Sequence, residues 1–171
     1  YKVWKCQGKP VKLTTPVLGK LTRKKRSILS RHNYIYLTEN LAKNHGFFAG
    51  VISRDDEEIG YRYGRTPCIL GLSEKDFGKL KDDDIVLMEP NGIITLVWAV
   101  ESSHNSILVT EDCNCSCIMC PQPRKKAGHL TELSFRLLRL LSPEKTRNIA
   151  ITGGEPTLIG QDLVRLISEC K

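Results

Sequence analysis

Residues 106–120 read Ser106-Ile-Leu-Val-Thr110-Glu-Asp-Cys113-Asn-Cys-Ser-Cys117-Ile-Met-Cys120, and this stretch decides the fold of the carboxyl-terminal part of the chain. Its first five residues are a short apolar run, which is typical of a buried strand. Four of the seven cysteines then fall within eight residues. A second apolar run, Asn148-Ile-Ala-Ile-Thr152, is closed by Gly153-Gly154-Glu155-Pro156. The sequence therefore predicts two strands, each leading into a loop of unusual composition.

An amphipathic helix is predicted after each of these strands, because apolar residues recur there at helical spacing. The apolar positions of the first helix are Leu130, Leu133, Leu137, Leu138 and Leu141. Those of the second helix are Leu163, Leu166, Ile167 and Cys170. Pro143 interrupts the first helix, since a proline disfavours helical backbone at the residue before it. The order strand, helix, strand, helix favours parallel strands joined by helical crossovers, an α/β arrangement.

Residues 1–104 differ in composition: they are rich in β-branched and aromatic residues, interrupted by Gly, Pro and Asn. Its predicted strands are 27–30, 34–37, 84–88 and 93–98. The last two form a hairpin, in which Asn91-Gly92 supplies the positive φ angles of a tight turn. Residues 73–80 predict a short helix. We therefore expect a small, mainly-β domain over 1–104, followed by two βα units over 105–171.

Composition sets the broad class of the protein. With 40% hydrophobic and 26% charged residues, the chain resembles ordinary soluble globular proteins. It has neither a run of about 18 apolar residues nor a secretory h-region, so we expect no membrane association. Seven cysteines without a secretory signal suit a reducing compartment and a metal site better than a disulfide framework. These features predict a cytoplasmic protein.

Positive charge is concentrated at the amino-terminal end. The net charge is +7, and residues 1–40 contain ten Lys/Arg and one acid, or +9. Arg23-Lys24-Lys25-Arg26 is interpreted first as a solvated loop, and alternatively as a contact for nucleic acid or an acidic peptide. Because no nucleic-acid-binding motif or interleaved aromatic residue accompanies the run, we do not expect nucleic acid as a partner.

The cysteine loop is typical of an iron–sulfur site. Cys113, Cys117 and Cys120 follow the spacing C-x3-C-x2-C, which lets one loop wrap a cluster, and three thiolates leave one of four irons open. Cys115 leaves a four-thiolate zinc or iron site conceivable, although the second ligand pair of a structural zinc site is absent. A thioredoxin-like pair of Cys117 and Cys120 would give Cys113 no role. Accidental clustering is the remaining alternative.

The cysteine loop after the first strand and Gly-Gly-Glu-Pro after the second, in that order, resemble the radical S-adenosylmethionine (SAM) superfamily. The resemblance implies that Cys113, Cys117 and Cys120 ligate a [4Fe–4S] cluster whose fourth iron is chelated by SAM. It also implies that Gly153, Gly154 and Glu155 contact the SAM amino group. The chemistry implied is reductive cleavage of SAM to a 5′-deoxyadenosyl radical, which takes hydrogen from a substrate.

A narrower resemblance is to the radical SAM maturases of the His-Xaa-Ser system, of the HxsC type. It rests on the Glu89-Pro-Asn-Gly92 hairpin, Ser103-His-Asn105 leading into Leu108-Val-Thr-Glu111, and Met119-Cys-Pro-Gln-Pro123. Met119 stands where the superfamily commonly has an aromatic residue, and its thioether can cover the SAM adenine. This resemblance implies a ribosomally made peptide as substrate and a second radical SAM maturase as partner. Arg124-Lys125-Lys126 is interpreted first as solvent-facing, and alternatively as a contact for an anionic partner such as an electron donor protein.

A radical SAM core resembles a partial TIM barrel of about six βα units, and this chain supplies two of them. We therefore expect the start of such a barrel, and a truncated chain that is inactive in isolation. No residue is assigned a catalytic role beyond the cluster and cofactor ligands. The rival hypothesis is a non-catalytic metal-binding protein whose basic amino-terminal region contacts nucleic acid.

Overall fold

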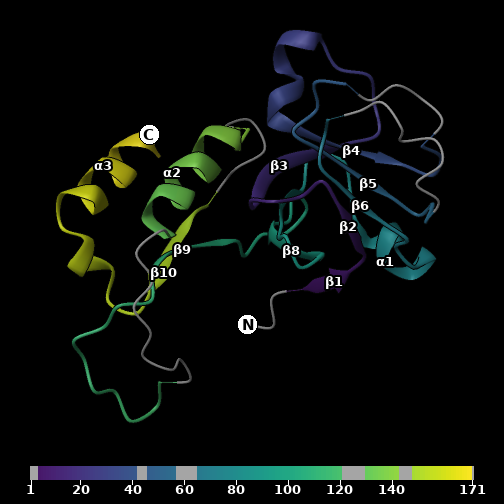
Figure 1. Ribbon diagram of the computed structural model, residues 1–171. Coiled ribbons are helices and arrows are strands. Elements are labelled where there is room, and N and C mark those ends of the chain that lie inside the picture. The colour runs from purple at the N-terminus through teal and green to yellow at the C-terminus, as the bar shows by residue number, and fades with distance from the viewer. Residues whose placement is uncertain (1–3, 42–45, 57–64, 121–129, 143–147, 171) are drawn as a thin grey trace. The chain divides into compact units, whose positions relative to one another are not determined.

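The computed structural model describes residues 4–41, 46–56, 65–120, 130–142 and 148–170 (Figure 1). The chain forms two compact units, Tyr1–Val100 and Glu101–Lys171. The predicted division between residues 104 and 105 falls in the segment that connects the last strand of the first unit with the first strand of the second. Within the described ranges, no helix combines the length and apolar character that a membrane span requires.

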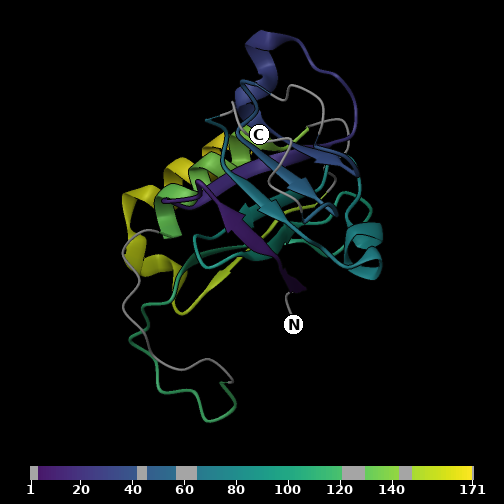
Figure 2. The ribbon, with the colours of Figure 1, turned by 45° about the vertical axis from the view of Figure 1, so that its right-hand side comes forward.

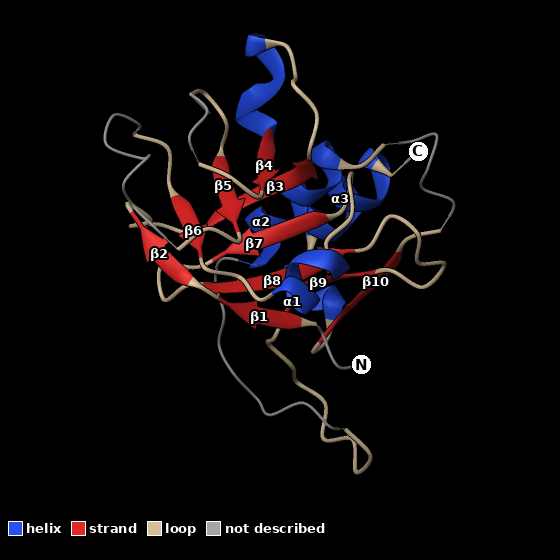
Figure 3. Ribbon diagram, turned by 90° about the vertical axis from the view of Figure 1, so that its right-hand side faces the viewer, coloured by secondary structure: helices blue, strands red, loops and turns tan. Residues whose placement is uncertain are grey.

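The first unit is built on one mixed sheet of eight strands (Figure 3). Its strands are β1 Lys5–Gln7, β2 Lys9–Val11, β3 Val17–Thr22, β4 Tyr34–Thr38, β5 Gly50–Ser53, β6 Cys68–Leu70, β7 Ile85–Met88 and β8 Ile93–Trp98. Their order across the sheet is β1-β8-β7-β3-β4-β5-β6-β2. The central strands β3, β4, β5 and β6 are parallel neighbours, and the remaining pairs are antiparallel. The expected mainly-β unit is thus a sheet with a parallel centre.

Gly8 lies between β1 and β2 and brings the two edges of this sheet together. Residues 5–7 pair with β8 at one edge, whereas residues 9–11 pair with β6 at the other. The Gly8 N–H donates to the Gly92 carbonyl oxygen at 3.0 Å. A Cβ atom on Gly8 would lie 2.5 Å from the Leu70 carbonyl oxygen, so only glycine fits where the two edges meet.

The core of the first unit is formed mainly by apolar side chains from the strands, together with Phe77 and leucines of the connecting segments. Phe77 comes from the helix α1, Glu74–Lys79, which confirms the short helix predicted over 73–80. Ser73 caps that helix by accepting a hydrogen bond from the Asp76 N–H at 3.1 Å. Residues fully excluded from solvent in this core include Leu21, Ile35, Val86, Met88, Ile52, Ile69 and Ile94.

The strand predicted over 27–30 is wrong: Ile28–Asn33 form a 3-10 helix, η1. Strands β3 and β4 are parallel neighbours, so the chain between them must cross back to the starting end of the sheet. The turn is closed where the Ser30 N–H donates to the Ser27 carbonyl oxygen at 3.0 Å. Ile28 is 60% and Leu29 86% exposed, so neither has the buried face that a strand would require.

The predicted hairpin is confirmed as β7 and β8, which pair antiparallel. The prediction for its turn is wrong at one residue. Gly92 has a φ of 82°, whereas Asn91 keeps a negative φ. Instead, the Asn91 side-chain oxygen accepts a hydrogen bond from the Ile93 N–H at 3.0 Å, and the Gly92 N–H donates to the Glu89 carbonyl oxygen at 2.9 Å. A four-residue turn needs only one left-handed residue, and Gly92 provides it.

The second unit has the predicted alternation of strands and helices. Its elements are β9 Ser106–Thr110, α2 Leu130–Leu140, β10 Ala150–Gly153, the 3-10 helix η3 Pro156–Ile159 and α3 Gln161–Glu169. Strands β9 and β10 are parallel, as expected. Leu137 and Ser134 of α2 are buried, and the Thr131 hydroxyl donates to the Val109 carbonyl oxygen at 3.1 Å. The described residues form two βα units and no closed barrel; Pro143 lies outside them.

Candidate metal and cofactor site

The cysteine loop and the Gly-Gly-Glu segment lie next to each other in the second unit. The cysteine loop follows β9, and the Gly-Gly-Glu segment continues from the end of β10 (Figures 1 and 2). Because β9 and β10 are parallel neighbours, both segments leave the sheet at the same edge. The carboxyl ends of parallel strands are where α/β folds place their binding sites. The fold thus brings the two sequence motifs together.

Backbone hydrogen bonds join the two segments. The Gly154 N–H donates to the Thr110 carbonyl oxygen at 2.9 Å, and the Glu155 N–H donates to the Asp112 carbonyl oxygen at 2.8 Å. The Thr110 hydroxyl also accepts from the Asp112 N–H at 3.0 Å. These hydrogen bonds fix the backbone of Asp112, the residue that immediately precedes Cys113. Sequence reasoning missed them, because they depend on the register of the strands.

The four cysteines of the loop are thiols that form no disulfide. Cys113 is half-buried, whereas Cys115, Cys117 and Cys120 are exposed. The loop is held by short local bonds: the Cys115 N–H donates to the Cys113 sulfur at 3.4 Å, and the Cys120 N–H donates to the Cys117 carbonyl oxygen at 3.2 Å. Among the described residues, no three His, Cys, Asp or Glu side chains converge as a metal site. The predicted ligands share one loop without meeting at one point.

The donor set nevertheless fits an iron–sulfur cluster. Thiolates are the ligands that such clusters use, and all three predicted ligands are cysteines of one loop that form no disulfide. Partial desolvation raises the pKa of the Cys115 thiol, and the neighbouring Cys113, Cys117 and Glu155 raise the pKa of Cys115 further. Its sulfur also lies 3.6 Å from the Asn114 side-chain oxygen.

Glu155 is an ionised carboxylate at the start of η3. One of its oxygens accepts from the Thr157 hydroxyl at 2.7 Å and from the Thr157 N–H at 3.1 Å. These two hydrogen bonds lower the pKa of Glu155, because they stabilise the charged form. A negative charge at this position suits the amino group of a ligand such as SAM.

Met119 lies at the tip of the cysteine loop with its side chain 91% exposed, and the neighbouring Ile118 is 99% exposed. Neither packs against the core of its unit, so both are available to cover an apolar ligand surface. Residues 121–129, which contain Pro121-Gln-Pro123 and the cations of 124–126, lie outside the described residues. The expectations attached to them therefore stay predictions.

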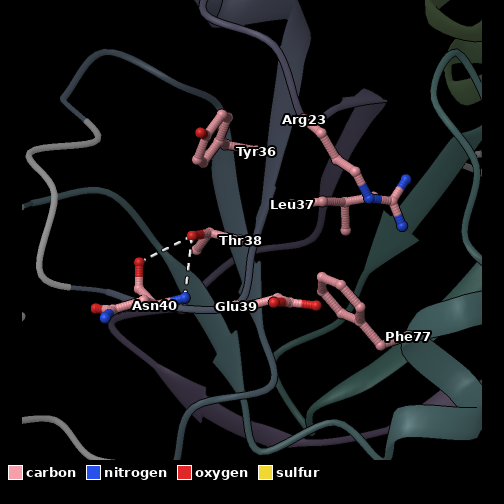
Figure 4. A pocket seen from close by; sticks show the side chains of 7 residues that line it. All are labelled: Arg23, Tyr36, Leu37, Thr38, Glu39, Asn40 and Phe77. Atoms are coloured by element: carbon pink, nitrogen blue, oxygen red, sulfur yellow. Dashed lines mark hydrogen bonds between the residues drawn. The ribbon is translucent and has the colours of Figure 1, made fainter.

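The first unit contains a separate hollow of about 300 Å³ at the carboxyl end of β4 (Figure 4). It is lined by Arg23, Tyr36, Leu37, Thr38, Glu39, Asn40 and Phe77. Its charged groups have internal partners: Arg23 lies 3.5 Å from Asp82, and Glu39 lies 3.7 Å from Arg54. No residue that the sequence predicted for the site lines this hollow.

The basic run is partly used inside the first unit. Arg23 contacts Asp82, and Arg26 lies 3.7 Å from Asp83, at the turn before β7. The Arg26 guanidinium also lies over the Tyr34 ring, 4.6 Å from its centre. Half of the run therefore stabilises the local fold, whereas Lys24 and Lys25 are exposed.

Comparison with known proteins gives distant matches. No protein-family model matches the chain. Over 117 residues it is 30% identical to molybdenum cofactor biosynthesis protein 1 of Drosophila melanogaster, a match that covers 64% of this chain and 20% of that protein. The chain thus spans about a fifth of the length of this curated relative. A UPF0107 protein solved by solution NMR matches with a TM-score of 0.42 and 15% identity, covering 55% of this chain and 99% of that one.

Proposed function

We propose that the chain is part of a radical SAM enzyme. The observation that carries this proposal is the pairing of a C-x3-C-x2-C loop with a Gly-Gly-Glu segment at the carboxyl ends of two adjacent parallel strands. The Gly-Gly-Glu segment alone is weak evidence, since glycine pairs often follow strands simply as turns, and its pairing with the cysteine loop is what gives it weight. The distant similarity to molybdenum cofactor biosynthesis protein 1 supports a radical SAM relationship.

In this proposal, Cys113, Cys117 and Cys120 hold a [4Fe–4S] cluster through their thiolates. When bound, the cluster and SAM supply a one-electron reductive cleavage that produces a 5′-deoxyadenosyl radical. Glu155 accepts hydrogen bonds from the SAM ammonium group, and its lowered pKa keeps it charged for that purpose. Met119 covers the adenine with its polarizable thioether.

We further propose that the enzyme is a peptide maturase of the His-Xaa-Ser system and acts in the cytoplasm. Its substrate is a ribosomally made peptide, and its partners are a second radical SAM maturase and an electron donor protein. This finer proposal rests on the sequence motifs from Glu89 to Pro123 alone. Binding of a tagged second maturase to the full chain, measured in extracts of the native organism, tests it.

The cluster assignment is tested by anaerobic reconstitution of the full chain with iron and sulfide. We expect about four irons per chain and the broad visible absorption of an iron–sulfur cluster. Cys113→Ser, Cys117→Ser and Cys120→Ser should each lose most of the iron. Cys115→Ser is the matched control, since it removes a thiol from the same loop and should keep the iron.

Two results would contradict this assignment. Bound zinc in place of iron, or the absence of bound iron, would favour the non-catalytic metal-binding protein. Loss of iron in Cys115→Ser as large as in the other three variants would favour a four-thiolate site, which leaves no open coordination position for SAM.

A further inference from the structure

Gly153 and Gly154 have a feature that cofactor contact alone does not explain. Neither residue has a positive φ, so the backbone conformation does not demand glycine at either position. What demands it is the proximity of another part of the chain. A Cβ atom on Gly153 would lie 2.5 Å from the Thr110 carbonyl oxygen, and one on Gly154 would lie 2.2 Å from the Asp112 carbonyl oxygen. Both distances are far below ordinary van der Waals contact.

The space left by the two missing side chains is therefore filled by the segment that enters the cysteine loop. A Cβ atom on Gly154 would also meet the Asp112 carbonyl carbon at 2.7 Å and the Glu111 carbonyl oxygen at 2.9 Å. These are backbone atoms, which cannot rotate away as the end of a flexible side chain can. Any residue larger than glycine at this position must push residues 111 and 112 outward.

Hydrogen bonds hold this close approach in place. Asp112 is fixed at both of its backbone polar groups, because its N–H donates to the Thr110 hydroxyl and its carbonyl oxygen accepts from the Glu155 N–H. Thr110 is itself only 3% exposed. Cys113 follows directly and is the half-buried member of the four cysteines, whereas the other three are exposed. The first cysteine of the loop is thus the one that is anchored.

We propose that Gly153 and Gly154 are positioning residues for the cysteine loop, which they fix at Asp112 and so at Cys113, independently of any contact with SAM. This inference rests on the proposed function for its consequence, the assembly of the cluster. The anchoring itself is a property of the metal-free chain. Gly-Gly-Glu then serves both motifs: its missing side chains seat the cysteine loop, and Glu155 supplies the carboxylate proposed to meet the cofactor.

The test is Gly154→Ala in the full chain, compared with Gly78→Ala. Gly78 lies in α1, and apart from its chain neighbours and the backbone of its own helix no described atom lies within 4 Å of the position of its Cβ, so the control adds the same methyl group without a clash. In metal-free Gly154→Ala, we expect amide hydrogen exchange at Glu155 and Asp112 to rise about fivefold to tenfold, as the loss of one hydrogen bond predicts. Amides of α2 and α3 should keep their protection. Alkylation of Cys113 should accelerate relative to Cys117.

A second variant guards against a general loss of structure in Gly154→Ala. Thr110→Val removes the hydroxyl that accepts from Asp112 while keeping the shape of the side chain. It should raise the exchange of the Asp112 amide and leave that of Glu155 nearly unchanged. After reconstitution without SAM, both variants should hold less iron per chain than the wild type, and Gly78→Ala should match the wild type.

The outcomes separate this inference from the proposed function. Normal exchange and normal iron in Gly154→Ala, with only SAM binding weakened, would overturn the positioning role and leave the radical SAM assignment standing. A wild-type chain that binds no iron, combined with faster exchange in Gly154→Ala, would support the anchoring and overturn the assignment. Uniformly faster exchange throughout the second unit in both variants would overturn the positioning role in favour of general destabilisation.

Discussion

Replacing Gly92 by alanine should destabilise the first unit through two separate costs. Gly92 has a φ of 82°, a region in which a residue with a Cβ loses about 1–2 kcal/mol. The added Cβ would also lie 2.2 Å from the Gly8 carbonyl oxygen. Relieving that clash moves Gly8 away and breaks its 3.0 Å hydrogen bond to the Gly92 carbonyl oxygen, at about 1 kcal/mol. Together these effects should lower the free energy of unfolding by roughly 2–3 kcal/mol.

Urea denaturation followed by tryptophan fluorescence measures this loss, because both tryptophans lie in the first unit and Trp98 is only 5% exposed. With a slope of about 1–3 kcal/mol per molar urea, the midpoint should fall by roughly 0.7–3 M. Gly78→Ala, in a helix and without a clash, should instead hold or raise stability by up to about 1 kcal/mol.

Gly92→Asn separates the two costs, since asparagine tolerates the left-handed region but still carries a Cβ. It should recover part of the loss and leave the contact with Gly8 unrelieved. A loss below about 1 kcal/mol in Gly92→Ala would refute the reasoning, because neither cost alone is that small. Full recovery in Gly92→Asn would show that the contact with Gly8 contributes nothing.

Three further predictions concern single groups. Because the pKa of Glu155 is lowered, its contribution to stability is present above the ordinary carboxyl pKa and is lost as pH falls through the pKa of the folded state. A carboxyl NMR titration should show the lowered pKa, and Thr157→Val should move it back toward the ordinary range. Burial raises the pKa of Cys6 to about 12 from 9.0, so its contribution to stability is fully present below pH 9 and is lost as pH rises toward 12. Cys6→Ala should therefore flatten the decline of stability between pH 9 and 12. Alkylation at pH 8 should spare the buried Cys6 and modify the exposed Cys117. Leu137→Ala should lower the free energy of unfolding of the second unit by about 2–5 kcal/mol, since Leu137 is 2% exposed. An unchanged thermal midpoint for α2 would show that the neighbouring side chains close the cavity left by the substitution.

The second unit was accessible to sequence analysis because its signals are local. An apolar run of five residues and leucines at helical spacing identify a strand and a helix without reference to the rest of the chain. The structure confirms these elements as β9, α2, β10 and α3. Their parallel arrangement also followed, because a helix between two strands is long enough to return the chain to the same end of the sheet.

Much of the first unit escaped prediction because its strands are short and their partners are distant. Strands β1, β2 and β6 have three residues each, too few for alternation to show. Pro10 argues against a strand by composition, yet β2 pairs with β6 on one side only, and an edge strand tolerates the missing N–H. The strand predicted over 27–30 is wrong for the opposite reason, because a β-like composition there belongs to a crossover turn.

The candidate site shows the same division between local and distant information. The identity of the cysteines and of Gly-Gly-Glu was readable from spacing and residue type. That Gly154 seats against Asp112 was not, because the contact depends on pairing Gly153 with Thr110 and on a shift of register at the end of β10. A sequence pattern identifies the residues of a motif. Only the register of β9 and β10 shows that the space beside Gly153 and Gly154 is filled by the backbone of residues 110–112.

The joining of both sheet edges at Gly8 also has a consequence for the order in which the first unit folds. Residues 5–7 pair with 93–95, and residues 9–11 pair with 68–70. During synthesis, residues 5–7 must therefore wait for their partner strand until nearly the whole unit has left the ribosome. Until then, the strands destined to receive it expose unpaired hydrogen-bonding groups, which makes this interval the time of greatest risk of association with other chains. The earliest residues of the unit thus complete its sheet last.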